Sequence, residues 1–248
     1  MLPVAFLACV VIGFIAGVIN VLAAGGSFLT LPLLLFLGLP ASVANGTNRV
    51  GIVTQNVAAA WSFHQHRVLD WRWALAVSTP ALLGAGIGVW GALRVPDIAF
   101  RRILSIVMLA MTLATLFRHS ISAEKPSPTR SPWHWTMVLG FFVVGLYGGF
   151  LQAGVGFLTL AMTNLAGLDL VRGNAVKVFA MSLLTLLSLA VFAATGNVDW
   201  PTGIALGIGN LVGGLVGVRL AVLRGHKWLE GVVTATVIVF AVLLWLTD

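Results

Sequence analysis

Long apolar stretches alternate with short polar ones along the whole chain. The apolar stretches run over residues 4–37, 43–63, 73–92, 100–117, 135–166, 172–194, 200–220 and 228–246. Most approach the ~20 residues that a helix needs to span hydrocarbon. They lack the inside/outside alternation of an outer-membrane barrel strand, and lipid-exposed backbone must satisfy its own hydrogen bonds. The pattern therefore predicts an all-α polytopic membrane protein with about eight transmembrane helices.

The chain also matches itself at an offset of 129 residues. The pairs include Phe28-Leu29-Thr30-Leu31 with Phe157-Leu158-Thr159-Leu160, Asn45 with Asn174, and Asp70-Trp71 with Asp199-Trp200. Chance agreement in a Leu- and Gly-rich chain is the alternative, but Asn, Asp and Trp are scarce here. We therefore predict two tandem repeats of four membrane segments each, with repeat 1 over residues 1–119, a polar linker over 120–132 and repeat 2 over 133–248.

The first segment of each repeat is too long for a simple span and contains glycines, Gly25-Gly26-Ser27 in one and Gly154-Val155-Gly156 in the other. We predict a helix broken at these glycines in both. Paired interruptions at corresponding positions of two repeats are typical of a transporter binding site, because a break exposes backbone amides and helix ends. The alternative is close helix packing through small residues.

The second segment of each repeat opens with polar residues. In repeat 1, Asn45, Asn48 and Arg49 share one helical face, and in repeat 2 Asn174 and Lys177 form the corresponding face. A polar stripe in a hydrophobic span should face the protein interior, and ionisable groups there usually mark a pathway.

Arg49 and Lys177 have no acid inside any apolar segment to neutralise them. Cations buried in low dielectric need a partner, so we expect a bound anion to supply the missing charge. On this interpretation, Lys177→Met should weaken anion binding and hardly disturb the empty protein. The alternative is that both side chains snorkel to the membrane interface.

Composition excludes other classes of protein. Of the residues, 59% are hydrophobic and 8% are charged, and mean hydropathy is +1.04, which no soluble fold matches. The net charge of +7 comes from Lys and Arg in short loops, which favours a topology signal over nucleic-acid binding. Tryptophans near segment ends predict an aromatic belt.

No catalytic, cofactor-binding or metal-ligand pattern occurs, and Cys9 is the only cysteine. We therefore predict a protein that is not an enzyme, with no cofactor and no metal.

These motifs resemble the TauE/SafE family of sulfite exporters and sulfonate permeases. The resemblance rests on Gly25-Gly26-Ser27, Leu31-Pro32, Gly38-Leu39-Pro40 and Ala44-Asn45-Gly46-Thr47-Asn48, with a weaker echo from Gly154 to Asn174. It implies a multi-pass transporter for small sulfur-containing anions, embedded in the lipid bilayer of the bacterial inner membrane. The transporter could form a homo-oligomer. Repeat 2 departs from the pattern, since Gly173-Asn174-Ala175-Val176 lacks the Gly-Thr pair.

The resemblance implies that Asn45, Thr47 and Asn48 contact the anion together with amides at Gly25 and Gly26. Repeat 2 would contribute Gln152, Gly154, Asn174 and Lys177, and the residue pattern adds Arg49 as a cationic attractor. Two rival functions share these features. A passive anion channel or facilitator would use the same residues, and a structural membrane protein would use the polar stripes only to hold helices together.

Overall fold

The computed structural model describes the backbone of residues 3–23, 25–117 and 131–247, and the described part contains helices and no strands. The helices are α1 (Pro3–Ala23), α2 (Ser27–Phe36), α3 (Ala41–Gln65), α4 (Trp71–Ala92), α5 (Asp97–Phe117), α6 (Trp135–Phe150), α7 (Val155–Leu165), α8 (Leu170–Ala194) and α9 (Trp200–Thr247). Within the described residues, four stretches are long and apolar enough to cross a membrane: Pro3–Leu22, Trp71–Ala92, Leu170–Ala194 and Trp200–Leu223. The predicted all-helical fold class is confirmed.

Both long first segments are interrupted, as predicted. The chain leaves the helix between α1 and α2, and again between α6 and α7. In the second case the interruption covers residues 151–154, a few residues earlier than the glycine cluster suggested. Gly154 has a φ of +76°, a left-handed conformation that glycine adopts without steric cost.

The two halves share several local features at the predicted offset. Helices α3 and α8 are both 25 residues long, and Leu170 follows Ala41 by 129 positions. Gly38 and Gly167, which end the preceding short helices, both have a φ of +85°. Arg67 and Gly196 are a further pair with positive φ at the same offset. The tandem duplication stays a prediction that these correspondences support; the predicted linker lies mostly outside the described residues.

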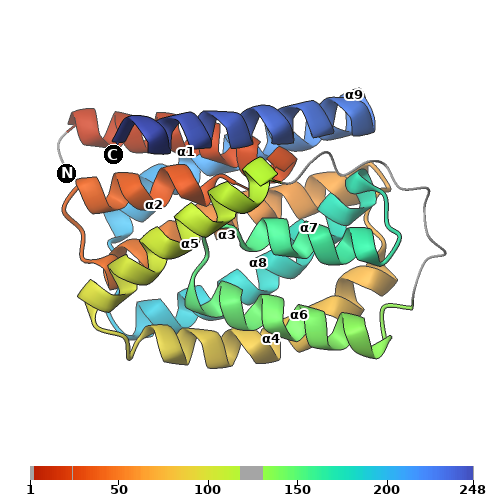
Figure 1. Cartoon of the computed structure of the whole chain (residues 1–248), viewed down its shortest axis with the longest axis horizontal. Coiled ribbons are helices and arrows are strands. Elements are labelled where there is room, and N and C mark those ends of the chain that lie inside the picture. The colour runs from red at the N-terminus through yellow and green to blue at the C-terminus, as the bar shows by residue number, and fades with distance from the viewer. Residues whose placement is uncertain (1–2, 24, 118–130, 248) are drawn as a thin grey trace.

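The helices of the two halves are interleaved (Figure 1). Helix α1 packs along α9, and α6 of the second half packs along α4 of the first. Between these two pairs, α3 and α8 contact each other and bury most of their polar stripes. The first half therefore completes its packing only against the second.

Glycines allow the close approach of α4 and α6. A Cβ atom at Gly84 would overlap the carbonyl oxygen of Phe142, and one at Gly145 would overlap that of Ala81. On the other pair, a Cβ at Gly213 would overlap the Phe14 carbonyl. Small residues at such crossings let helix backbones touch, which stabilises helix pairs inside a membrane.

We expect Gly84→Ala to lower the apparent melting temperature of the purified protein in detergent, by the equivalent of about 1 to 3 kcal/mol, because the added methyl forces α4 and α6 apart. Gly86→Ala in the same helix is the matched control. A Cβ at Gly86 would meet nothing within 4 Å beyond its chain neighbours and the backbone of its own helix, so this variant should be neutral or slightly stabilising. Equal melting temperatures for the two variants would contradict the packing argument.

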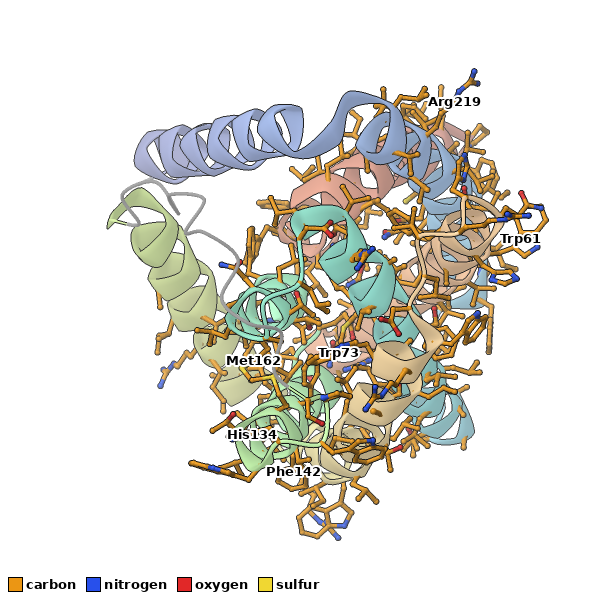
Figure 2. All side chains as sticks on the ribbon, turned by 90° about the vertical axis from the view of Figure 1, so that its right-hand side faces the viewer. Trp61, Trp73, His134, Phe142, Met162 and Arg219 are labelled. Carbon is orange, nitrogen blue, oxygen red and sulfur yellow. The ribbon has the colours of Figure 1, made fainter. Side chains whose placement is uncertain are left out.

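The last two predicted segments form one helix, α9, where the sequence analysis expected a break between residues 220 and 228. The prediction of two separate helices here is wrong at the level of secondary structure. The polar stretch Arg224-Gly225-His226-Lys227 contains no proline, and Lys and Arg are good helix formers, so the backbone hydrogen bonds continue through it. Figure 2 shows that the ribbon of α9 nevertheless turns sharply.

Most of the described tryptophans fit an interfacial belt. Trp61, Trp90, Trp133 and Trp135 expose more than half of their side chains. Trp73 is the exception, since it is 4% exposed and packs in the core with Met137 and Phe141. Figure 2 shows Trp61 at the outside of the molecule and Trp73 in the interior.

Candidate functional site

The two helix interruptions create four helix ends inside the protein. Helices α1 and α6 end there with backbone carbonyls that have no partner within their own helix. Helices α2 and α7 begin there, and the amides of Phe28 and Phe157 donate to the carbonyls of Gly25 and Gly154. The residues preceding α2 and α7 are Gly26 and Gly154, and neither helix has a side-chain cap. At each interruption, a helix C-terminus with partial negative charge is thus followed within a few residues by a helix N-terminus with partial positive charge.

The beginnings of α2 and α7 come together in space. The rings of Phe28 and Phe157 stack with their centroids 6.2 Å apart. These phenylalanines are a matched pair of the predicted duplication. The two interruptions therefore meet between the halves.

Arg49 of α3 closes the end of α6. Its Nη1 donates to the carbonyl of Gly148 at 3.1 Å and to Gln152 Oε1 at 3.1 Å, and its Nη2 donates to the carbonyl of Gly149 at 2.7 Å. The guanidinium also lies over the ring of Phe192, 4.9 Å from its centroid. A cation at a helix C-terminus interacts favourably with the helix dipole. The side chain is completely buried.

Lys177 of α8 does the same at the end of α1. Its Nζ donates to the carbonyl of Asn20 at 2.9 Å and to that of Val21 at 3.3 Å. The side chain is 2% exposed. Each half therefore supplies the cation that caps the interrupted helix of the other half.

These contacts correct the electrostatic expectation from the sequence. Neither cation snorkels, because both are buried. Neither lacks a partner either, because the carbonyls of α6 and α1 accept their hydrogen bonds. The argument that only a bound anion could compensate the two charges was therefore wrong. Sequence reasoning considered side-chain acids and missed the backbone acceptors.

Asn45, Asn48 and Asn174 are buried, as predicted for the polar stripe. Asn45 Nδ2 donates to the carbonyl of Phe150 at 3.1 Å, which adds a second side chain to the end of α6. Asn48 Oδ1 accepts from Thr30 of α2 at 2.6 Å. The described residues offer no hydrogen-bond partner to Asn48 Nδ2, Arg49 Nε, Asn45 Oδ1 or Asn174 Oδ1.

A second polar side chain accompanies each cation. Gln152 lies in the interruption after α6, where its Oε1 accepts from Arg49 and, at 3.5 Å, from Thr185. In the other half, Asn20 Nδ2 donates to Gln55 Oε1 at 3.0 Å, and Gln55 Nε2 donates to Asn56 at 3.2 Å. Each of the two buried cations thus lies beside a cluster of hydrogen-bonded polar side chains.

Thr47 does not join this group. Its hydroxyl accepts a hydrogen bond from the backbone amide of Asp199 at 2.8 Å, between α8 and α9. The neighbouring Gly46 packs so closely on the Asn197 carbonyl that a side chain would overlap it. This part of the motif therefore holds the α8–α9 connection in place, and the anion contact implied for Thr47 finds no support in its hydrogen bonding.

The glycines of the motif have separate roles. Gly25 and Gly26 are buried beside α1, and a Cβ at Gly26 would overlap the carbonyl of Ala16. Gly154 supplies the left-handed turn before α7.

Sequence reasoning missed Asn20 and Thr30 as parts of the site. Both are polar residues within an apolar run, and Thr30 has a match in Thr159, which is the signal that could have found them.

In the part of the chain that the structure describes, no group of three or more His, Cys, Asp or Glu side chains could hold a metal ion. Asp70 and Asp169 lie at helix starts, where they cap α4 and α8 by accepting from backbone amides.

Comparison with known proteins places the chain in a family. The family model described as "Sulfite exporter TauE/SafE" matches residues 9–244. A "Probable membrane transporter protein" of Haemophilus influenzae is 27% identical over 92% of this chain and 89% of its own length. A relative from Sinorhizobium, "Probable membrane transporter protein ORF9", is 27% identical over 94% of this chain and 90% of its own. The "Probable membrane transporter protein YfcA" of Escherichia coli K12 is 26% identical over 94% of this chain and 85% of its own length.

No solved structure matches the chain. The family model and the relatives each extend over nearly the full length, and four of the described helical stretches are long and apolar enough to span a bilayer. The chain belongs to the TauE/SafE family of membrane transporters.

Proposed function

We propose that the protein exports small sulfur-containing anions, such as sulfite or organosulfonates, across the bacterial inner membrane. The anion would bind where the interrupted helices meet, at the repeat interface. The residues proposed to hold it are Gly25, Gly26, Asn45, Asn48, Arg49, Gln152, Gly154, Asn174 and Lys177, while Thr47 keeps a structural role.

One observation carries this proposal. Asn48 Nδ2 and Arg49 Nε are neighbouring donors on α3, both side chains are buried, and neither atom has a hydrogen-bond partner among the described residues. A buried donor without a partner costs about 1 to 3 kcal/mol, so an occupant with acceptor oxygens would be favoured. Sulfite and sulfonate groups carry three such oxygens, and their charge suits a site beside two cations and two helix N-termini.

The unpaired acceptors narrow the ligand class further. Asn45 Oδ1 and Asn174 Oδ1 can only receive hydrogen bonds. A ligand with both sulfonate oxygens and a donor hydrogen, such as an aminoalkanesulfonate, would satisfy donors and acceptors together. We therefore include aminosulfonates in the proposed range of substrates.

A thermal-shift panel with sulfite, sulfate, thiosulfate, methanesulfonate and taurine tests the binding claim, with chloride at matched ionic strength as the reference. A ligand that binds only the folded protein raises its melting temperature with concentration. We expect sulfur oxyanions to do so and chloride to have little effect. The absence of any anion-dependent shift would favour a structural membrane protein instead.

We expect Asn48→Leu to weaken anion binding about 10-fold or more, because a charge-assisted hydrogen bond worth about 1.5 to 3 kcal/mol is lost. Asn164→Leu is a matched control, since Asn164 is exposed on α7. Binding isotherms of both variants with sulfite decide the result. Unchanged affinity in Asn48→Leu would remove this residue from the site, and flux that never saturates with concentration would favour a channel.

A further inference from the structure

The amine of Lys177 has two acceptors in the protein, the carbonyls of Asn20 and Val21. A neutral amine carries two N–H hydrogens and a lone pair, whereas an ammonium carries three N–H hydrogens. The described residues thus satisfy both hydrogens of the neutral form and leave the third hydrogen of the charged form without an acceptor. The hydrogen-bond acceptors around Lys177 therefore suit the neutral amine, and the ammonium would have one N–H left to bond a ligand.

The corresponding cation of the other half differs in this respect. Arg49 caps α6 as Lys177 caps α1, but a guanidinium keeps its proton under all conditions in which proteins fold. A lysine can exist in either state, and buried lysines are used as proton acceptors for this reason. The chain therefore has one fixed and one titratable cation at its two helix ends.

Among the side chains that the structure describes, no other titratable group bonds to Lys177. The helices packed against α8 are α1, α3, α4, α6, α7 and α9. Their titratable or charged side chains, among those described, are Cys9 on α1, Arg49 and His64 on α3, Arg72 on α4, Tyr147 on α6 and Arg219 on α9, with none on α7; α8 itself carries Arg172. None of them forms a hydrogen bond or ion pair with Lys177 Nζ, and Arg172 is paired with Asp169 at the helix start.

We propose that Lys177 is the proton-binding group that couples anion movement to the proton gradient. This inference rests on the proposed function. The amine takes one proton from the aqueous side from which the anion enters, and the third N–H of the resulting ammonium pairs with the anion. On the opposite side the anion leaves and the ammonium returns its proton to water. One proton and one negative charge cross together, so a singly charged anion moves without net charge. During export the outward gradient of the anion drives this step, and a proton leaves with each anion.

After the anion has left, the empty transporter must return to the conformation that binds the next anion. This step favours a group that can lose its charge. Without the anion, the third N–H of a buried ammonium has no acceptor among the described residues, whereas both hydrogens of the neutral amine are bonded, so loss of the proton is favoured. Proton relays inside membranes are more often built from carboxylates and histidines. Among the described side chains, no acid forms an ion pair with Lys177, and the amine itself can carry the proton.

The test uses proteoliposomes containing the full chain, a pH-sensitive dye inside the vesicles and methanesulfonate as the probe, because this anion does not itself take up protons in the working pH range. Potassium and valinomycin hold the membrane potential at zero. We expect an inward methanesulfonate gradient to acidify the lumen of wild-type vesicles. An imposed gradient with acid outside should accumulate methanesulfonate several-fold above its external concentration.

Lys177→Arg keeps the positive charge but cannot release its proton. We expect it to retain measurable downhill methanesulfonate flux, with neither lumen acidification nor accumulation. Arg94→Lys, a charge-conserving exchange at an exposed residue outside the site, is the control and should keep a normal ratio of protons to anions. Should Lys177→Arg fail to fold, Lys177→Met gives the same test at raised anion concentration, because it too cannot change its charge.

The outcomes separate the two proposals. Saturable methanesulfonate flux in wild type without acidification would overturn proton coupling and leave the transport proposal standing. Acidification that persists in Lys177→Arg would overturn the assignment to this residue. Wild-type vesicles that move none of the sulfur anions would instead refute the proposed function.

Discussion

Replacing Arg49 by Met is expected to destabilise the protein by about 2 to 3 kcal/mol or more, the range for losing a hydrogen bond to a charged group in the interior. The variant would leave the carbonyls of Gly148 and Gly149 buried without their donor and would free Gln152. Met has a similar length and apolar character, so the change is chiefly in hydrogen bonding. The apparent melting temperature in detergent, without any anion, measures it.

Arg94→Met is a suitable control for this experiment. Arg94 is exposed at the end of α4 and stacks over Trp90, with its guanidinium 3.5 Å from the ring centroid. Its loss should change stability by about 0.5 kcal/mol or less, as for most surface substitutions. Arg49→Lys should be intermediate, because an ammonium can reach fewer acceptors than the planar guanidinium. A melting temperature for Arg49→Met equal to that of Arg94→Met would show that the helix cap contributes little.

Lys177→Met is expected to weaken anion binding by about 2 to 5 kcal/mol, the cost of truncating one partner of a buried charged contact, which is roughly 30-fold to several thousand-fold. The structure changes the expectation for the empty protein. Because Lys177 donates to the carbonyls of Asn20 and Val21, its replacement should also lower stability without anion. Isotherms with sulfite at matched ionic strength, and melting curves without it, measure the two effects separately.

Lys177→Arg helps to separate binding from stability, because it keeps a cation at the end of α1. We expect it to lose less affinity than Lys177→Met. Equal dissociation constants for wild type and Lys177→Met would place the anion away from this residue. In that case the lysine would serve only as the cap of α1.

Much of the fold could be predicted from the sequence because membrane spans obey simple rules. Length and hydropathy identified the apolar segments, and two glycine clusters located the interruptions to within a few residues. The exception is α9. There a charged stretch was interpreted as a loop, but a loop requires residues that stop the helical hydrogen bonds, and Arg224 to Lys227 contains only one glycine.

The candidate site was less accessible to sequence reasoning, because half of its contacts involve the backbone. The sequence identified Arg49 and Lys177 as buried cations but could not name the carbonyls of Gly148 or Asn20 as their partners. Which helix end meets which cation depends on how the halves interleave. That arrangement follows from helix packing far along the chain, and the one-dimensional pattern of polar residues does not encode it directly.

The exchange of caps between halves has a consequence for synthesis and ancestry. While only the first half has entered the membrane, the end of α1 lacks its donor and Arg49 lacks its acceptors, since both partners lie in the second half. The first half should therefore mature only after α8 has inserted. If the halves arose by duplication, their single-repeat ancestor would have worked as a homodimer in which each subunit closed the other's broken helix, and gene fusion would have made that exchange permanent.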